Sequence, residues 1–380
     1  MSLSHPALRT RTVVASRILV AVTVGFACAA HGATLSNTPD RTWVTDGPVN
    51  AITRVGDTIH IGGQFQTVGP RTGPGVEVAL DGTQNPALPE VSGAGPSTTG
   101  GSLTGLRAVA SDGAGGWFIS GLFTHVGGVA RTNLAHILGD DSVDPAFNPV
   151  LDGNVEALAL SGTTLYIGGA FTHVGAASRN NVAALSVTDG SVTGFNPDAD
   201  AEVQALVIST DGNTVYAGGN GFTNIGGAAR TALAALDPIT GNAIASFNPV
   251  LVMANGAPTV AALAVSGTTV LAGGNFESVN GTPLRTIAAL DANGSPISGF
   301  APAPTYFNCA PCATIAAIAV SGSTVYLGGS FDTIGGASRS NMAAISATTG
   351  VVTAFDPDSP SNILSIAAVG NTVYVGGGFQ

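Results

Sequence analysis

Four polar residues stand at the same place in consecutive repeats of this sequence and could contact a ligand together. Each is the second residue of the apolar segment that opens its repeat: Asn50, Arg107, Glu156 and Gln204. Amide, guanidinium and carboxylate groups supply both hydrogen-bond donors and acceptors. The three later repeats carry Ala261, Ala316 and Leu364 there. We expect the polar four to form half of a small-ligand pocket or of a partner's contact surface; ordinary solvated residues are the alternative.

Three acidic residues alternate in one short segment, where they could bind a metal ion. Asp198, Asp200 and Glu202 present carboxylates at every second position, and Ca²⁺ takes about six to eight oxygen ligands. The segment lacks the glycine and the distal glutamate of an EF-hand loop. The sequence leaves open a calcium site and an exposed acidic turn, and it indicates no other cofactor.

Other patterns of catalytic or metal-binding residues are weak. His125 and His173 share a loop position in adjacent repeats, but no third metal ligand accompanies them. No Ser/His/Asp set stands out, and the glycine pairs end strands instead of opening helices, unlike nucleotide-binding loops. We therefore expect no catalytic residues.

Residues 300–314 form an insertion that carries two aromatic residues and two cysteines, Tyr306, Phe307, Cys309 and Cys312. A local disulfide between the cysteines is the leading interpretation for an exported chain. A redox CxxC motif would need a helix start, and a zinc site would need two further ligands. Because recognition often lies on loops held by a rigid scaffold, we expect Tyr306 and Phe307 to contribute to binding. Residues 69–105 are a second insertion.

Residues 1–33 have the pattern of a secretory signal peptide. Three arginines and no acidic residue precede an uncharged apolar run at 18–30, and small residues follow. A membrane-spanning helix needs about 20 apolar residues, more than this run offers. We expect removal of 1–33 on export, leaving 34–380 as a single domain that is secreted, periplasmic or at the cell surface. An uncleaved anchor and a lipid attached at Cys28 are the alternatives.

The composition of the remaining chain excludes several classes of partner and fold. All basic residues are arginines, acidic residues number 23, and the net charge of the whole chain is −11. Such a charge disfavours nucleic acids and anionic membranes as partners. Hydrophobic residues make up 44% and glycines number 53, so we expect an ordered chain of strands joined by tight turns.

A Gly-Gly-x-Phe signature, or a near variant, defines the repeat. It ends at intervals of 48 to 58 residues, at Phe65, Phe123, Phe171, Phe222, Phe276, Phe331 and Phe379. The unit from Val155 to Pro197 predicts four strands, at 155–160, 165–169, 181–187 and 192–195. One such sheet leaves two apolar faces in water, whereas sheets packed around a ring bury both. The prediction is an all-β fold, a β-propeller of four-stranded antiparallel blades; a solenoid is the rival.

The number of half-repeats bears on how the ring would close. Seven first halves and six clear second halves are present, and residues 42–47 precede the first repeat. We expect about seven blades, with the last incomplete and closed by this N-terminal segment. Six blades plus an overhang, or a chain shortened from a longer parent, are the alternatives.

The units resemble the bacterial delta-60 repeat. The resemblance is carried by Asp144 to Pro149, Val155 to Leu158, Gly168 to Val174 and Arg179, and it extends from about Trp43 to Phe379. It implies a propeller of an exported protein and brings no catalytic residues. A weaker likeness to quinoprotein propellers lies in Ala234 to Gly241, but phenylalanine replaces their outer-strand tryptophan.

One arginine per unit precedes the third strand, at Arg71, Arg131, Arg179, Arg230, Arg285 and Arg339. Because one reaction needs one site, a sixfold residue indicates a structural role, such as binding loop carbonyls; a ring of anion contacts is the alternative. Taken together, the sequence predicts a non-enzymatic binding module for a protein or glycan at the cell envelope. The alternative is an enzyme with its site at the channel mouth, quinoprotein dehydrogenase-like or acting on polysaccharides.

Overall fold

The computed structural model describes residues 45, 47–55, 58–65, 75–79, 89–93, 105–306, 312–369 and 372–378. The chain divides into two units, Met1–Ala33 and Thr34–Gln380, and every described residue belongs to the second. These residues form an all-β structure in which we find no helix. Accordingly, no helix in the described ranges has the length and apolar character to cross a membrane. The predicted signal peptide lies outside the described residues.

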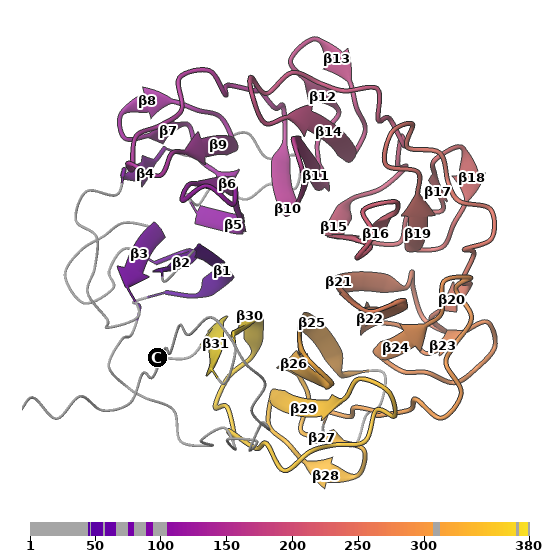
Figure 1. The fold of residues 1–380 in the computed structure, drawn as a ribbon. Helices are drawn as coiled ribbons and strands as arrows, with labels where there is room; N and C mark the ends of the chain where they lie inside the picture. The colour runs from indigo at the N-terminus through magenta and orange to yellow at the C-terminus, as the bar shows by residue number, and fades with distance from the viewer. Residues whose placement is uncertain are drawn as a thin grey trace, which may run out of the picture. The chain divides into compact units, whose positions relative to one another are not determined.

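Seven antiparallel sheets follow one another along the described chain (Figure 1). Sheets 1 to 3 consist of β1 (Val49–Val55), β2 (Thr58–Gly63) and β3 (Gly75–Ala79); β5 (Gly105–Ser111), β6 (Trp117–Leu122) and β9 (Leu134–Ile137); β10 (Asn154–Ser161), β11 (Thr164–Ala170) and β14 (Val182–Ser186). Sheets 4 and 5 consist of β15 (Val203–Ile208), β16 (Val215–Gly219) and β19 (Leu233–Leu236); β21 (Thr259–Ser266), β22 (Thr269–Asn275) and β24 (Ile287–Leu290). Sheets 6 and 7 consist of β25 (Thr314–Ser321), β26 (Thr324–Ser330) and β29 (Met342–Ser346); β30 (Ile363–Val369) and β31 (Thr372–Gly377).

Short strands pair outside these sheets, in segments that the sequence predicts as loops. They are β4 (Val91–Ser92), β7 (His125–Val126) and β8 (Val129–Ala130); β12 (His173–Val174) and β13 (Ala177–Ser178); β17 (Asn224–Ile225) and β18 (Ala228–Ala229); β20 (Leu251–Val252) and β23 (Ser278–Val279); β27 (Thr333–Ile334) and β28 (Ala337–Ser338). Most are hairpins of two residues a side, turned by glycines with positive φ such as Gly127 and Gly175.

The first strands of the seven sheets contact one another in chain order. β1 contacts β5, and the contacts continue through β10, β15, β21 and β25 to β30; β30 in turn contacts β1 (Figure 1). The N-terminal and C-terminal sheets of the described chain are therefore neighbours. The segment 42–47, predicted to add a strand to sheet 7, lies largely outside the described residues.

The predicted fourth strand, placed at 192–195 in the unit of sheet 3, is wrong in its extent. In the unit of sheet 3, only Val192 pairs, in a single bridge with Leu185. Thr193 N–H still donates to the carbonyl of Ala184, but the groups beyond it bond to side chains: Thr193 O accepts from Arg179 Nη2 at 2.9 Å, and Phe195 N donates to Thr193 Oγ1 at 3.2 Å. Because these groups are already satisfied, the segment does not extend the ladder.

The Gly-Gly-x-Phe signature is explained by close packing on three sides. A Cβ at the first glycine would collide with the next sheet's first strand, as at Gly168, where Val203 Cγ1 would lie 2.7 Å away. The second glycine lies against its own first strand; Gly169 faces the carbonyl of Asn154. The phenylalanines are buried in the core at Phe65, Phe123, Phe171, Phe222, Phe276 and Phe331. Gly376 of sheet 7 meets Val49 of sheet 1 in the same way.

Four of the recurring arginines bind backbone carbonyls, which confirms their structural role. In each, Nη1 donates to the carbonyl of the preceding residue. Nη2 donates to a carbonyl beyond the third strand at 2.7–3.0 Å, in Arg131, Arg179, Arg230 and Arg339. Arg71 lies outside the described residues.

For Arg285 the structural assignment is wrong. This residue lies two positions before β24, whereas the other described arginines lie three positions before their third strands. Leu284 takes the equivalent place and is 5% exposed, and the Arg285 side chain is exposed.

Candidate functional site

Each first strand contains a β-bulge at the position singled out by the sequence. In β10, Val155 pairs with Gly169 and Ala157 with Gly168, so Glu156 is the extra residue. The same irregularity recurs at Asn50, Arg107, Gln204, Ala261, Ala316 and Leu364. A bulge leaves its residue unpaired and redirects its side chain. We call these seven residues the mouth positions.

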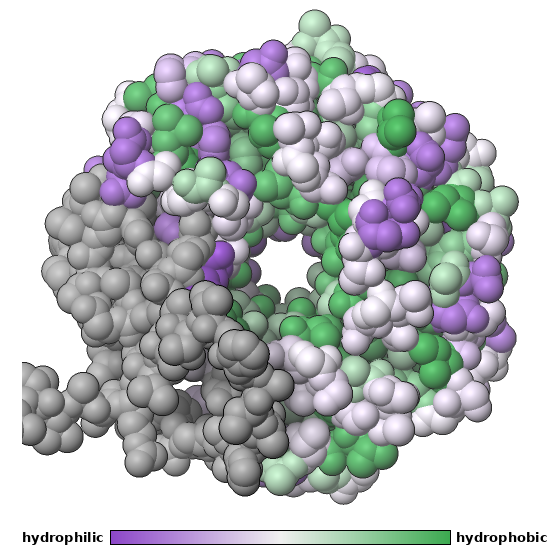
Figure 2. Space-filling view, in the orientation of Figure 1, coloured by the Kyte–Doolittle hydropathy of each residue, from purple (hydrophilic) through white to green (hydrophobic). Residues whose placement is uncertain are grey.

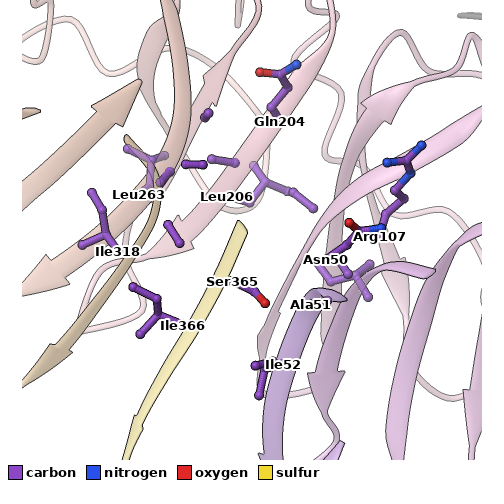
Figure 3. Close-up of a pocket in the computed structure, with 18 of the residues that line it drawn as sticks. Asn50, Ala51, Ile52, Arg107, Gln204, Leu206, Leu263, Ile318, Ser365 and Ile366 are labelled. Atoms are coloured by element: carbon purple, nitrogen blue, oxygen red, sulfur yellow. The ribbon is translucent and has the colours of Figure 1, made fainter. Parts of the chain in front are cut away.

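A cavity of about 280 Å³ lies among the first strands (Figure 3). Five of the mouth positions line it, namely Asn50, Arg107, Gln204, Ala261 and Ala316. Figure 2 shows both polar and apolar residues around the central opening. The structure thus brings together three of the four polar residues that the sequence selected, and Glu156 adjoins them through Arg107.

The charged pair at the mouth is loosely joined. Arg107 Nε lies 3.8 Å from Glu156 Oε1, and both side chains are partly exposed. Glu156 Oε1 instead accepts a hydrogen bond from Asn154 Nδ2 at 2.6 Å. Arg107 Nε is buried and has no hydrogen-bond partner among the described residues. The Arg107 side chain is 29% exposed, so its terminal N–H groups, and not the buried Nε, are the donors that a ligand could reach.

The two amide residues at the mouth differ in how they are held. Gln204 Nε2 donates to Glu202 Oε2 at 2.9 Å. Asn50 Nδ2 donates to the carbonyl of Leu106, in the neighbouring first strand, at 3.0 Å. These bonds occupy an amide N–H of each residue and fix the side chains beside the cavity.

Glu156 is the titratable group at the mouth whose chemistry is most altered. Burial raises its pKa above the usual 4.5, while Arg107 and the hydrogen bond from Asn154 lower it. The Glu202 carboxylate adds a further raising effect. The carboxyl is thus closer to its neutral form than an exposed glutamate would be.

Beyond the mouth the cavity is apolar, which the sequence analysis did not predict. The next residue of each first strand is alanine, except for Ser365 in sheet 7, and these residues are almost all buried. The residue after that is a half-buried aliphatic in all seven sheets, which we call the aliphatic tier: Ile52, Val109, Leu158, Leu206, Leu263, Ile318 and Ile366. The signal was readable in the sequence as an aliphatic residue at the fourth position of the first segment in every unit.

The predicted aromatic binding residues do not join this site. Tyr306 is half-buried and packs against the core cluster that contains Phe300 and Phe331, and it is not a lining residue of the cavity. Phe307 and Cys309 lie outside the described residues, so the disulfide with Cys312, which is exposed, stays a prediction.

The three alternating acids are engaged separately. Asp200 accepts hydrogen bonds from the backbone and side chains of Thr223 and Asn224. Despite its partial burial, which raises the pKa, these bonds lower the pKa of Asp200 to about 2. Asp198 accepts from Asn180 Nδ2 at 2.6 Å, and Glu202 accepts from Gln204.

No metal-binding arrangement of at least three His, Cys, Asp or Glu residues occurs in the described ranges. His173 Nδ1 lies 3.2 Å from Asp152 Oδ2, and His125 Nδ1 lies 2.9 Å from Thr124 Oγ1. Calcium binding stays a prediction that direct metal analysis must test.

Comparisons with known proteins show a likeness of fold to solved structures. No family model matches the chain, and no curated protein matches it. The computationally designed Ika8 protein is similar, with 14% identity and a TM-score of 0.51 over 87% of this chain and 94% of that one. The extracellular domain of a B. thetaiotaomicron protein assigned as a one-component system has 12% identity and a TM-score of 0.50 over 90% of this chain. This chain spans 39% of the length of that domain. Such low identities carry a likeness of fold alone, and the delta-60 resemblance stays a prediction.

Proposed function

We propose that the chain is a non-enzymatic, exported binding module that holds a protein or glycan at the cell envelope. One observation carries the proposal: the seven first strands share one bulged position, five of these residues line one cavity, and the four polar ones come from consecutive sheets. A one-sided polar mouth suits an asymmetric ligand, because donors and acceptors are presented on one side and small or apolar side chains on the other.

The scaffold in this proposal is a seven-bladed β-propeller of delta-60 type, closed where sheet 7 meets sheet 1. Support comes from the contacts of β30 and β31 with β1 and from the packing of Gly376 on Val49. If residues 42–47 complete the last blade, their deletion exposes an unpaired sheet edge. We expect a lower midpoint of thermal unfolding after this deletion; an unchanged midpoint would argue against closure by this segment.

Affinity capture with the purified chain tests the binding function. Envelope extracts and glycan arrays are probed with the unaltered chain and with Arg107→Gln, in parallel with and without added calcium. Arg285→Gln is the matched control, because this arginine is exposed and is not among the residues that line the cavity. The proposal is supported if Arg107→Gln loses a captured partner that the unaltered chain and Arg285→Gln both retain. Retention of every partner by folded Arg107→Gln and Glu156→Ala proteins would exclude the mouth as the site.

An enzyme with its site at the mouth is the second candidate, and the raised pKa of Glu156 favours it. A carboxyl of this kind could serve as a general acid. Against this candidate, none of the described lining residues is His, Cys, Asp or Glu. Turnover of a polysaccharide or of a quinone-linked alcohol substrate that is abolished in Glu156→Gln would favour the enzyme.

A further inference from the structure

The cavity among the first strands combines one basic side chain with an aliphatic wall. Arg107 is the only charged residue among its described lining residues. In Figure 3, Arg107 and Gln204 lie in the upper part of the view, and Ile366 and Ile52 lie below them. A ligand that uses both regions must carry a polar head and an apolar group a short distance from it.

The N–H groups of Arg107 determine which polar group a ligand must carry. The Glu156 carboxylate is too far from Arg107 Nε for a hydrogen bond, at 3.8 Å, and Glu156 is bonded to Asn154 instead. A guanidinium presents parallel N–H groups that match the two oxygens of a carboxylate.

The aliphatic tier determines the character of the ligand's other group. Its seven side chains are half-buried, so each keeps some apolar surface that a ligand could cover. None of the described lining residues is aromatic, so the cavity offers no flat ring on which a sugar could stack. The wall therefore fits a leucine-like or alkyl group better than a glycan.

We propose that the cavity binds a carboxylate joined to an aliphatic group, as at the C-terminus of a protein partner whose last side chain is aliphatic. The carboxylate pairs with Arg107 at the mouth, and the side chain contacts the aliphatic tier. This inference rests on the proposed binding function and names the chemical group recognised. A free alkyl carboxylate presents the same chemistry and is the other source to distinguish.

Isothermal titration calorimetry of the purified chain at pH 7 tests the proposal with defined probes. N-acetyl-leucine carries both groups, N-acetyl-leucinamide lacks the charge, and N-acetylglycine lacks the aliphatic group. The titrations use about 0.15 M salt, where the Debye length is about 8 Å, to screen repulsion from the chain's net charge of −11. We expect N-acetyl-leucine to bind at one site and each of the other two amino-acid probes to bind at least about tenfold more weakly.

Variants assign the binding to the two regions of the cavity. Arg107→Gln is expected to weaken N-acetyl-leucine binding about tenfold, since it removes a charge-assisted hydrogen bond. Leu263→Ala should weaken it as well, because it shortens the aliphatic wall. Arg285→Gln and Ile239→Ala are the controls, as Arg285 is exposed and Ile239 is 76% exposed. Circular dichroism verifies that each variant is folded.

Three results would overturn the proposal: no binding of any carboxylate probe, equal binding of N-acetyl-leucine and its amide, or unchanged affinity in folded Arg107→Gln. Octanoate distinguishes the sources; tighter binding than N-acetyl-leucine assigns the site to a free alkyl carboxylate, and weaker binding assigns it to a chain end. If no carboxylate binds but Arg107→Gln still loses a captured envelope partner, this inference fails and the binding function stands. If capture is also unchanged, both fail.

Discussion

The first two sheets differ from the later ones at one cross-strand pair. Where the second strand meets the third, sheets 3, 4 and 6 place a tyrosine opposite an alanine, in Tyr166–Ala184, Tyr216–Ala235 and Tyr326–Ala344. Sheet 1 places His60 opposite Glu77, and sheet 2 places Phe118 opposite His136. The same cross-strand pair thus joins a tyrosine to an alanine in sheets 3, 4 and 6, and it contains a histidine in each of the first two sheets.

The two histidines at this position are buried in opposite surroundings. His60 is 2% exposed, packs on Trp117 with ring centroids 4.4 Å apart, and its Nδ1 has no partner among the described residues. His136 is 7% exposed and lies between two carboxylates. Its Nδ1 is 2.8 Å from Asp144 Oδ2, and its Nε2 is 3.3 Å from Asp112 Oδ2.

The difference shows what a repeat needs in order to accept a buried ionisable group. In sheet 2 the buried His136 is accompanied by two carboxylates that bond to it. The turn between β5 and β6 supplies Asp112, and the segment after β9 supplies Asp144. At the place of Asp144, sheet 3 has Thr193, whose N–H likewise bonds to the third strand. Among the described residues, His60 Nδ1 has no such partner, and burial lowers the pKa of this histidine.

The largest effect is expected from His136→Ala, which installs the residue of sheet 3. Asp112 and Asp144 would then face an apolar gap without their shared partner. Leaving a buried carboxylate without its hydrogen-bond partner costs about 1–3 kcal/mol or more, and this change does so for two carboxylates at once. We expect a loss of this size in the free energy of unfolding, measured by urea denaturation.

The double variant His136→Ala/Asp144→Thr is the matched control, because it restores the pair found in sheet 3. It should recover much of the lost stability; a loss as large as that of the single variant would mean that the unpaired Asp144 carboxylate is not the source of the loss. Burial raises the pKa of Asp144, but hydrogen bonds from His136 and from the N–H of Ala146 outweigh this and lower it. The stabilisation is therefore present above pH 3.8, the ordinary pKa, and is lost as pH falls through the folded value.

The sequence predicted the repeated part of this molecule well and its departures poorly. Strands followed from short apolar runs between glycine turns, and the mouth positions followed from counting along those runs. The partners of His136 lie 24 and 8 residues away, in a turn and in an outer segment, so only the fold brings them together. Arg285 was misassigned because one residue fewer separates it from its strand, which moves Leu284 into the arginine's place.

His60 should make the protein acid-sensitive in a defined range. Burial lowers its pKa from 6.5 to about 4, against a raising effect of Asp141. The folded state therefore binds this proton less readily than the unfolded state. Stability is full above pH 6.5 and falls as the pH drops toward 4, by up to about 3 kcal/mol.

His60→Tyr tests this by installing the tyrosine of sheets 3, 4 and 6. Unfolding free energies of both proteins are measured from pH 7 to pH 4. The variant should lose the pH-dependent component in that window. An equal decline in both proteins would assign the acid sensitivity to other groups.

A smaller effect is expected where sheet 2 and sheet 3 differ in the Gly-Gly pair. Ser120 is fully buried at the place that Gly168 takes in sheet 3. In Gly168→Ser the new Cβ would lie 2.7 Å from Val203 Cγ1, and such overpacking costs about 1–3 kcal/mol. The reverse change, Ser120→Gly, should cost less than about 1 kcal/mol. Thermal unfolding of the two variants measures these losses of stability. Equal losses would mean that the interfaces of the two sheets are packed alike.

The smallest effect is a gain, at a position where sheet 2 follows the repeat and sheet 5 departs from it. Asn133, Asn181 and Asn341 precede their third strands with positive φ, and each donates from Nδ2 to a backbone carbonyl in the segment leading to the next sheet. Thr286 takes this place in sheet 5 with φ of 63°, is fully buried, and its hydroxyl has no partner among the described residues.

Thr286→Asn should therefore stabilise the protein. A β-branched residue is strained at positive φ, whereas asparagine tolerates it, and the amide could reach the carbonyl that the threonine hydroxyl does not. We expect a gain of about 1 kcal/mol in unfolding free energy. Thr286→Ala separates the two contributions, because it removes the buried hydroxyl without adding the amide. If Thr286→Asn is no more stable than Thr286→Ala, the asparagine bonds of sheets 2, 3 and 6 contribute little, and backbone conformation alone explains the preference at this position.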